Sequence, residues 1–254
     1  MSFLSHKVGD PHTPNGAEKR TLGSRDELVQ EIARLPQDWH LAGVMTEEVL
    51  RAIARYAARM EISASLETGS GKTTLLFSHL SREHKVFAVD DGNRSITAVR
   101  ESPLLNRATV EFIDGPTQLT LPRYAFTGKL QMALIDGPHG YPFPEMEYYY
   151  IYPLLDVGAV LIVDDIHIPT IRRLYEFLCE EEMFQLLEVV GNSAFFRRTS
   201  ATMFSPLGDG WWEQKFNIKR FPAGVRRTTF SKVKGWVGKR LPGTLKERIE
   251  RISG

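Results

Sequence analysis

The strongest constraint on the fold of this chain is a regular alternation of short apolar runs with helix-like segments, which begins near residue 61. Runs such as "LQMALID" (130–136) and "AVLIVDD" (159–165) are apolar at consecutive positions, as strands buried on both faces are. Strands that alternate with helices form a parallel sheet with helices on both of its faces. The pattern therefore predicts a doubly wound, Rossmann-like α/β domain with a mostly parallel sheet.

The same pattern assigns the individual elements. The predicted helices span residues 24–35, 46–60, 73–84, 94–102, 144–155 and 169–181. Strands are predicted at 62–67, 85–90, 109–114, 130–136 and 159–165, and a last strand pair is drawn from 185–191, 193–199 and 217–222. Together these segments predict a seven-stranded sheet.

Composition and charge divide the chain into parts. We predict a disordered N-terminal segment over 1–23, a helical extension over 24–60, the α/β domain over 61–222 and a basic C-terminal tail over 223–254. The formal net charge is only +1, but the tail holds nine basic residues against two acidic ones. Such a tail can make weak contact with an anionic surface, whereas nothing in the sequence indicates specific nucleic-acid binding.

The bulk composition is that of a globular protein. With 42% hydrophobic residues, the chain has enough apolar side chains for one large core. Neither a secretory signal nor a run of 18 uncharged apolar residues is visible, so a cytoplasmic protein without a transmembrane segment is expected. The single cysteine, Cys179, excludes an internal disulfide and is expected to be buried. The sequence leaves a homo-oligomer open.

Acidic side chains follow almost every predicted strand. In an open α/β sheet, ligands bind beyond the carboxyl ends of the strands. The acids at these ends are Glu67, Asp90, Asp91, Asp114, Asp136, Asp164 and Asp165. We therefore expect this edge of the sheet to hold the functional site.

The stretch "LETGSGKTTLL" (66–76) admits two interpretations. A nucleotide phosphate loop has a glycine at its first position and ends in Gly-Lys-Ser/Thr, which residues 71–73 match. Leu66 replaces the first glycine, however, and Glu67 would repel a triphosphate. The alternative is a glycine turn for an adenosine-bearing ligand, supported by Asp90, an acid at the end of the next strand that could bind ribose hydroxyls.

At this point the chain resembles the class I S-adenosylmethionine-dependent methyltransferases. "LETGSGKTTLLFSHL" is similar to their first motif, "KVFAVDD" to their second and "VEFIDGP" to their third. The stretch 136–165 is similar to the D-G-x-H block and final D-D pair of a small-molecule O-methyltransferase branch, which includes macrolide and aminocoumarin sugar O-methyltransferases. The resemblance covers about residues 60 to 200.

The resemblance implies S-adenosylmethionine as the cofactor. The glycine turn would line its methionine and ribose, Asp90 would accept hydrogen bonds from the ribose hydroxyls, and the turn that begins at Asp114 would border the adenine. The expected cofactor-binding residues are Glu67, Gly69, Ser70, Gly71, Thr73, Asp90, Asp114, Gly115 and Asp136.

Three carboxylates at the ends of two predicted strands suggest a divalent metal ion. Asp136, Asp164 and Asp165 converge if these strands are neighbours, and a hard ion such as Mg²⁺ would relieve their repulsion. Consecutive strand residues point to opposite faces, so the last two can share an ion only if the chain turns there. His139 is the candidate general base and, with Asp136, the predicted catalytic pair; another base stays open.

These expectations combine into one predicted function and two alternatives. The predicted function is methyl transfer from S-adenosylmethionine, assisted by a divalent metal, to a small hydroxylated acceptor such as a sugar, a phenol or a secondary metabolite. The first alternative is a P-loop NTPase or kinase that uses Gly71, Lys72 and Thr73. The second is an inactive scaffold that binds the cofactor, suggested by Pro116 and Pro138. Oxygen and nitrogen both stay open as the methylated atom.

Overall fold

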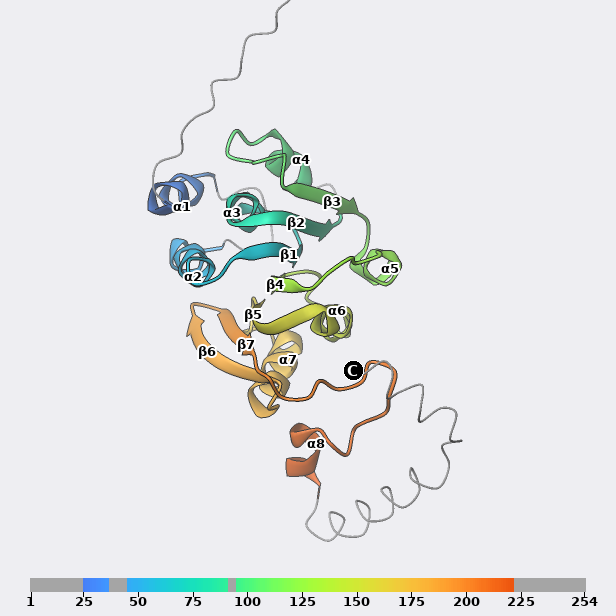
Figure 1. Cartoon of the computed structure of the whole chain (residues 1–254). Helices are drawn as coiled ribbons and strands as arrows, with labels where there is room; N and C mark the ends of the chain where they lie inside the picture. Colours follow the sequence, from blue (N-terminus) through green and yellow to red (C-terminus); the bar gives the residue numbers. More distant parts are fainter. Residues whose placement is uncertain (1–24, 37–44, 91–94, 222–254) are drawn as a thin grey trace, which may run out of the picture.

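The structure is a computed structural model that describes residues 25–36, 45–90 and 95–221 (Figure 1). Asp91, the predicted disordered segment and the predicted basic tail lie outside the described residues. None of the helices in the described ranges is long and apolar enough to cross a bilayer.

A seven-stranded sheet forms the centre of the molecule, in the order β3-β2-β1-β4-β5-β7-β6. Strands β1 to β5 pair in parallel, and β7 pairs antiparallel with both β5 and β6. The bounds are β1 Ile62–Thr68, β2 Ser81–Ala88, β3 Val110–Asp114, β4 Leu130–Ile135, β5 Leu155–Val163, β6 Phe184–Val190 and β7 Ser193–Arg198. The predicted mostly parallel, seven-stranded sheet is therefore confirmed.

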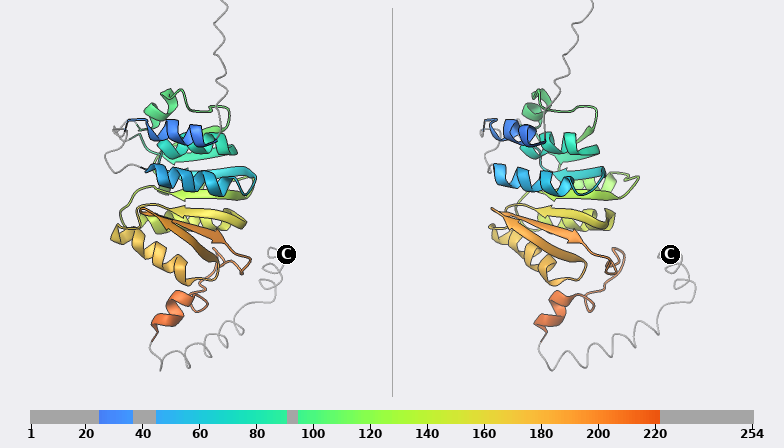
Figure 2. Two further views of the ribbon diagram at one scale, coloured as in Figure 1. Left: turned by 90° about the vertical axis from the view of Figure 1, so that its left-hand side faces the viewer. Right: turned by 60° about the vertical axis from the view of Figure 1, so that its left-hand side comes forward.

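Helices cover both faces of this sheet (Figures 1 and 2). The helices α1, α2 and α3 pack in one core, and α6 and α7 pack in a second core on the opposite face. The bounds are α1 Arg25–Ala33, α2 Glu47–Ala57, α3 Lys72–Leu80, α4 Ser95–Glu101, α5 Thr117–Thr120, α6 Phe143–Ile151, α7 Pro169–Glu180 and α8 Lys215–Arg220, with 3₁₀ turns η1 Leu121–Arg123 and η2 Tyr152–Leu154. The doubly wound fold class is thus confirmed.

The central strands carry apolar residues at consecutive positions because their side chains alternate between the two cores. In β4, Met132 and Leu134 belong to the core on the α1 side, whereas Ala133 and Ile135 belong to the core on the α7 side. All four are at most 3% exposed. Burial on both faces is what a parallel sheet covered by helices requires.

The predicted helix over 73–84 is too long. Helix α3 ends at Leu80, and the next residues already belong to β2. Strand pairing overrides the helical pattern, because the Ser65 hydroxyl on β1 shares hydrogen bonds with the Ser81 hydroxyl at 2.6 Å and with Nδ1 of His84 at 2.7 Å. These buried polar groups satisfy one another only when β1 and β2 lie side by side.

The last strand pair forms from two of its three candidate segments, 185–191 and 193–199, while residues 217–220 of the third belong to α8. One expectation for the C-terminal third is wrong. Cys179 is exposed on α7 and not buried. The apolar side of α7 is formed by Ile171, Leu174 and Leu178 at helical spacing, and the cysteine follows just outside it.

Candidate functional site

The carboxyl ends of β1 to β5 meet at one edge of the sheet and are joined by hydrogen bonds there. The amides of Gly69 and Gly115 each donate to a carbonyl near the end of β2 at 2.9 Å. The amide of Asp164 donates to the carbonyl of Ile135 at 3.0 Å. The turns that carry the predicted site residues therefore lie next to one another in the order of the strands.

The glycine turn after β1 lies directly against the end of β4. Gly69 has a φ of +89°, which is the left-handed region that favours glycine. A Cβ at this position would lie 2.6 Å from the carbonyl oxygen of Asp136. Glycine is thus required here both for the positive φ of the turn and for the close approach of the end of β4.

Glu67, just before this turn, is hydrogen-bonded to the first residues of α3, just after it. Its side chain is fully buried, and its carboxylate accepts hydrogen bonds from the hydroxyls of Thr73, at 2.7 Å, and Thr74. Nε2 of His84 lies 3.2 Å from the same carboxylate. Glu67 and Thr73 were predicted to contact the cofactor; their side chains are engaged with each other, so that role stays a prediction.

Lys72 points away from the turn that it follows in sequence. Its ammonium donates to the carbonyls of Ala33 at 3.0 Å and Leu35 at 2.8 Å, at the C-terminal end of α1. Burial lowers the pKa of this lysine. The phosphate-loop hypothesis needs the ammonium at the loop, and in this structure the group satisfies helix carbonyls instead.

The remaining predicted cofactor residues lie on the β2 and β3 side of the edge. Asp90 is exposed and accepts a hydrogen bond from Thr97 at 2.9 Å. Asp114 pairs with Arg100 at 3.1 Å. Ser70 is buried and its hydroxyl lies 3.4 Å from that of Ser95, while Gly71 caps the N-terminus of α3. Their contact with a ligand stays a prediction.

Two acids and a histidine form a cluster at the ends of β4 and β5. Nε2 of His139 lies 3.7 Å from Oδ1 of Asp136 and 3.3 Å from Oδ2 of Asp165. One ligand atom from each of the three residues lies within 4.8 Å of the others. Nε2 of His139 is buried and makes no hydrogen bond. Such an arrangement can hold either a proton or a metal ion between two negative charges.

The charges of this cluster shift one another's proton affinity. Burial raises the pKa of Asp136, and the nearby Asp164 and Asp165 raise it further. The pKa of His139 is raised, chiefly by its interaction with Asp136. Without a metal ion, the imidazole thus favours its charged form beside the carboxylates.

The carboxylates of Asp164 and Asp165 have different partners. The strands β4 and β5 are neighbours, with Ile135 opposite Val163, and the chain turns at Asp165, whose φ is 54°. The carboxylate of Asp164, however, accepts a hydrogen bond from Ser193 of β7. The structure thus brings Asp136 and Asp165 together with His139, and a metal-ligand role for Asp164 stays a prediction.

The sequence patterns missed two buried residues that hold the end of β4. The amide of Asp136 donates to Oγ1 of Thr68 at 3.0 Å, and that hydroxyl donates to Oε2 of Glu147 at 2.8 Å. Oε1 of Glu147 has no hydrogen-bond partner and lies against Gly137, where a Cβ would approach it to 2.1 Å. Glu147 on α6 thus fixes the start of the loop that carries His139.

Helical spacing could have revealed Glu147. It lies four residues before Ile151 and three after Pro144, and all three belong to the buried face of α6. An acid on the apolar face of a helix needs a partner inside the protein. Nothing in the sequence indicated that this partner is Thr68.

The buried Glu147 predicts a pH dependence of stability. Burial raises its pKa from 4.5 to about 7. Between these values the folded state holds a proton that the unfolded state releases, so the free energy of unfolding should fall as the pH rises, by up to about 3 kcal/mol. Glu147→Gln cannot ionise, so denaturant unfolding of this variant should lose less stability over that interval than the wild type. Parallel loss in both proteins would contradict the assignment.

Several solved structures have a similar fold. The O-methyltransferase of tomaymycin synthesis from Streptomyces achromogenes, solved with S-adenosylmethionine, has a TM-score of 0.53 at 17% identity, covering 71% of this chain and 93% of that one. An O-methyltransferase from Bacillus cereus, in complex with S-adenosylhomocysteine, has a TM-score of 0.51 at 16% identity, covering 69% and 90%. A methyltransferase from Geobacter sulfurreducens has a TM-score of 0.52 at 15% identity, covering 71% and 93%.

The sequence comparisons agree with this fold. No curated protein matches the chain. A family model described as a methyltransferase domain matches residues 66–166, which extend from the end of β1 to just beyond β5. This stretch includes the glycine turn and the cluster of Asp136, His139 and Asp165. Residues 66–166 therefore match a methyltransferase domain, and the fold around them is the one found in these solved methyltransferases.

Proposed function

We propose that the protein transfers a methyl group from S-adenosylmethionine to a hydroxyl group of a small molecule. The observation that carries the proposal is the cluster of Asp136, His139 and Asp165, which lies at the same sheet edge as the glycine turn of Gly69. Similar folds are found in O-methyltransferases that bind S-adenosylmethionine or S-adenosylhomocysteine. The acceptor would approach the cluster, and the cofactor would bind along the turn.

The cluster also fits a divalent metal ion. Two carboxylates and an imidazole nitrogen that has no hydrogen-bond partner form a suitable donor set. Mg²⁺ prefers oxygen ligands, so the imidazole of His139 favours Mn²⁺ or a later transition metal over the expected Mg²⁺. When bound, such an ion would lower the pKa of an acceptor hydroxyl and orient it.

The residues of the chain would perform the rest of the chemistry. Asp136 and Asp165 supply negative charge that holds a cation beside the acceptor. His139 can take the hydroxyl proton at Nε2 only in its neutral form and when that atom binds no metal. Gly69 keeps the turn close to the end of β4, so that donor and acceptor meet at one place. Methyl transfer then depends mainly on this positioning.

Binding of the cofactor is tested first. Isothermal titration with S-adenosylhomocysteine should give binding in the micromolar range, and titration with ATP and Mg²⁺ should give none. Lys72 provides the physical reason, because its ammonium is bound to carbonyls of α1 and does not face a nucleotide. Binding of ATP alone would overturn the proposal in favour of an NTPase.

Metal dependence and activity are tested next. Methyl transfer from labelled cofactor to a panel of sugars and phenols should fall on addition of a chelator and recover with Mn²⁺ better than with Mg²⁺. Transfer that is insensitive to chelator would assign His139 as a metal-independent base. Cofactor binding without transfer to any acceptor would favour the scaffold alternative.

A further inference from the structure

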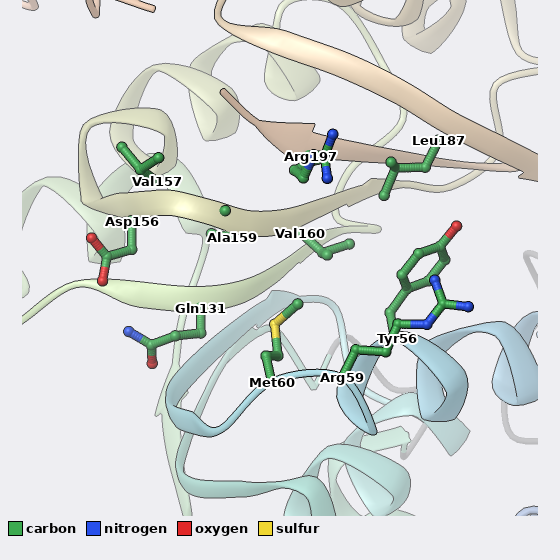
Figure 3. Close-up of a pocket in the computed structure, with 11 residues that line it drawn as sticks. Tyr56, Arg59, Met60, Gln131, Asp156, Val157, Ala159, Val160, Leu187 and Arg197 are labelled. Atoms are coloured by element: carbon green, nitrogen blue, oxygen red, sulfur yellow. The ribbon is translucent and has the colours of Figure 1, made fainter. Parts of the chain in front are cut away.

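A hollow lies toward the amino ends of β4 and β5 (Figure 3). The candidate site lies at the carboxyl ends of the same strands. The volume of the hollow is about 420 Å³, within the range of small-molecule sites. We call it the amino-end groove and define it by Arg59 and Met60 after α2, Val157 in β5, Leu187 in β6 and Arg197 in β7. The proposed methyl transfer does not use any of these residues.

Two irregularities of the sheet shape this groove. Leu130 pairs with Leu155 but Met132 pairs with Val160, so β5 advances by five residues where β4 advances by two. The extra residues include Val157, which is 65% exposed, on the groove wall. Bulges are over-represented next to functional sites, where they redirect side chains.

The second irregularity lies in β6. Leu186 pairs with Phe196 and Glu188 pairs with Phe195, so Leu187 is the additional residue between them. Leu187 lines the groove as well. Gly158 adds a left-handed turn, with φ of +91°, and a Cβ there would contact nothing within 4 Å. The backbone at Gly158 is therefore bent beside open space and not beside packed side chains.

Two guanidinium groups and one carboxylate, that of Asp156, line the groove, and neither guanidinium forms an ion pair among the described residues. The guanidinium of Arg59 lies 5.4 Å from the centre of the Tyr56 ring, and that of Arg197 donates to the neutral amide of Gln185. By contrast, the nearby Arg55 pairs with Glu188. The contacts with ring and amide orient both groups without neutralising them.

The two guanidinium groups outnumber the single carboxylate of Asp156, so the lining has a net positive charge, and part of its wall is apolar. We propose that the amino-end groove binds a small organic anion. Its carboxylate or phosphate would be held by Arg59 and Arg197, since planar guanidinium groups match these anions geometrically. Its apolar body would lie against Met60, Val157 and Leu187. Binding at this groove does not depend on the proposed methyl transfer, because the two sites lie at opposite ends of the strands.

Fluorescence titration with 8-anilinonaphthalene-1-sulfonate tests this site, since the probe combines an aromatic body with one anionic group. The double variant Arg59→Gln/Arg197→Gln should bind the probe at least tenfold more weakly than the wild type. Arg82→Gln, which removes a guanidinium elsewhere on the surface, should bind within about threefold of the wild type. Equal weakening of probe binding in the double variant and in Arg82→Gln would mean that only the net charge of the protein matters, and it would overturn the proposal.

A second pair of variants separates an effect of charge from an effect of misfolding, because both change the same exposed position. Val157→Glu places a negative charge on the exposed groove wall, and Val157→Gln places a neutral group of the same shape there. The first should weaken probe binding about tenfold and the second should not. Equal losses from the two substitutions would overturn the charge-based assignment.

Competition experiments locate the bound probe and distinguish which class of anion the groove prefers. Saturating S-adenosylhomocysteine should leave probe binding unchanged, and complete displacement would place the probe in the cofactor site and overturn the proposal. Benzoate and phenyl phosphate distinguish a carboxylate ligand from a phosphate ligand by which of them displaces the probe. Failure of both at millimolar concentration would also overturn it.

Discussion

Replacing Asp165 by asparagine is expected to lower the rate of methyl transfer by about a hundred- to a thousandfold, because it removes one of the two charges that flank His139. Asparagine tolerates the left-handed backbone that Asp165 adopts at a φ of 54°, so the turn should persist. The loss should therefore fall on catalysis and metal affinity. Isothermal titration with S-adenosylhomocysteine and the melting temperature should stay near their wild-type values.

Asp26→Asn is the matched control for this change. Asp26 is an exposed acid on α1 with 79% of its side chain accessible, and its substitution should leave the rate unchanged. A rate for Asp165→Asn within threefold of the wild type would show that this carboxylate takes no part in the reaction. Equal losses of cofactor affinity and of rate would instead assign it a structural role.

The position of the site could be predicted because it follows from the sheet. Parallel strands bring their carboxyl ends to one edge, so acids after successive apolar runs had to lie near one another. The close approach of Asp136 to the glycine turn of Gly69 agrees with this reasoning. No knowledge of individual side-chain contacts was needed for that step.

The orientation of the side chains could not be predicted in the same way. Asp164 and Asp165 are adjacent in sequence, and only the antiparallel return of β7 brings Ser193 to the first of them. Glu67 is buried because the hydroxyls of Thr73 and Thr74, in the first turn of α3, donate hydrogen bonds to its carboxylate. Both outcomes depend on contacts between elements, about which the local pattern of residues carries no information.

Gly69→Ala is expected to give the second large effect, on stability and on cofactor binding together. An alanine there must adopt a φ of +89°, at a cost of about 1–2 kcal/mol, and its Cβ would meet the carbonyl oxygen of Asp136 at 2.6 Å. Relief of that clash requires the ends of β1 and β4 to move apart, which adds about 1–3 kcal/mol. The affinity for S-adenosylhomocysteine should fall at least tenfold.

Gly158→Ala separates the two contributions, because that glycine has nearly the same φ, +91°, with open space beside it. The stability of this variant should reflect only the cost of placing alanine at a positive φ. Replacing glycine by alanine also lowers the conformational entropy of the unfolded chain, and this stabilising effect is the same in both variants. Denaturant unfolding should therefore place Gly69→Ala about 1–3 kcal/mol below Gly158→Ala. Equal stabilities would mean that the turn and the end of β4 do not constrain each other, and the joint placement of donor and acceptor would lose its structural basis.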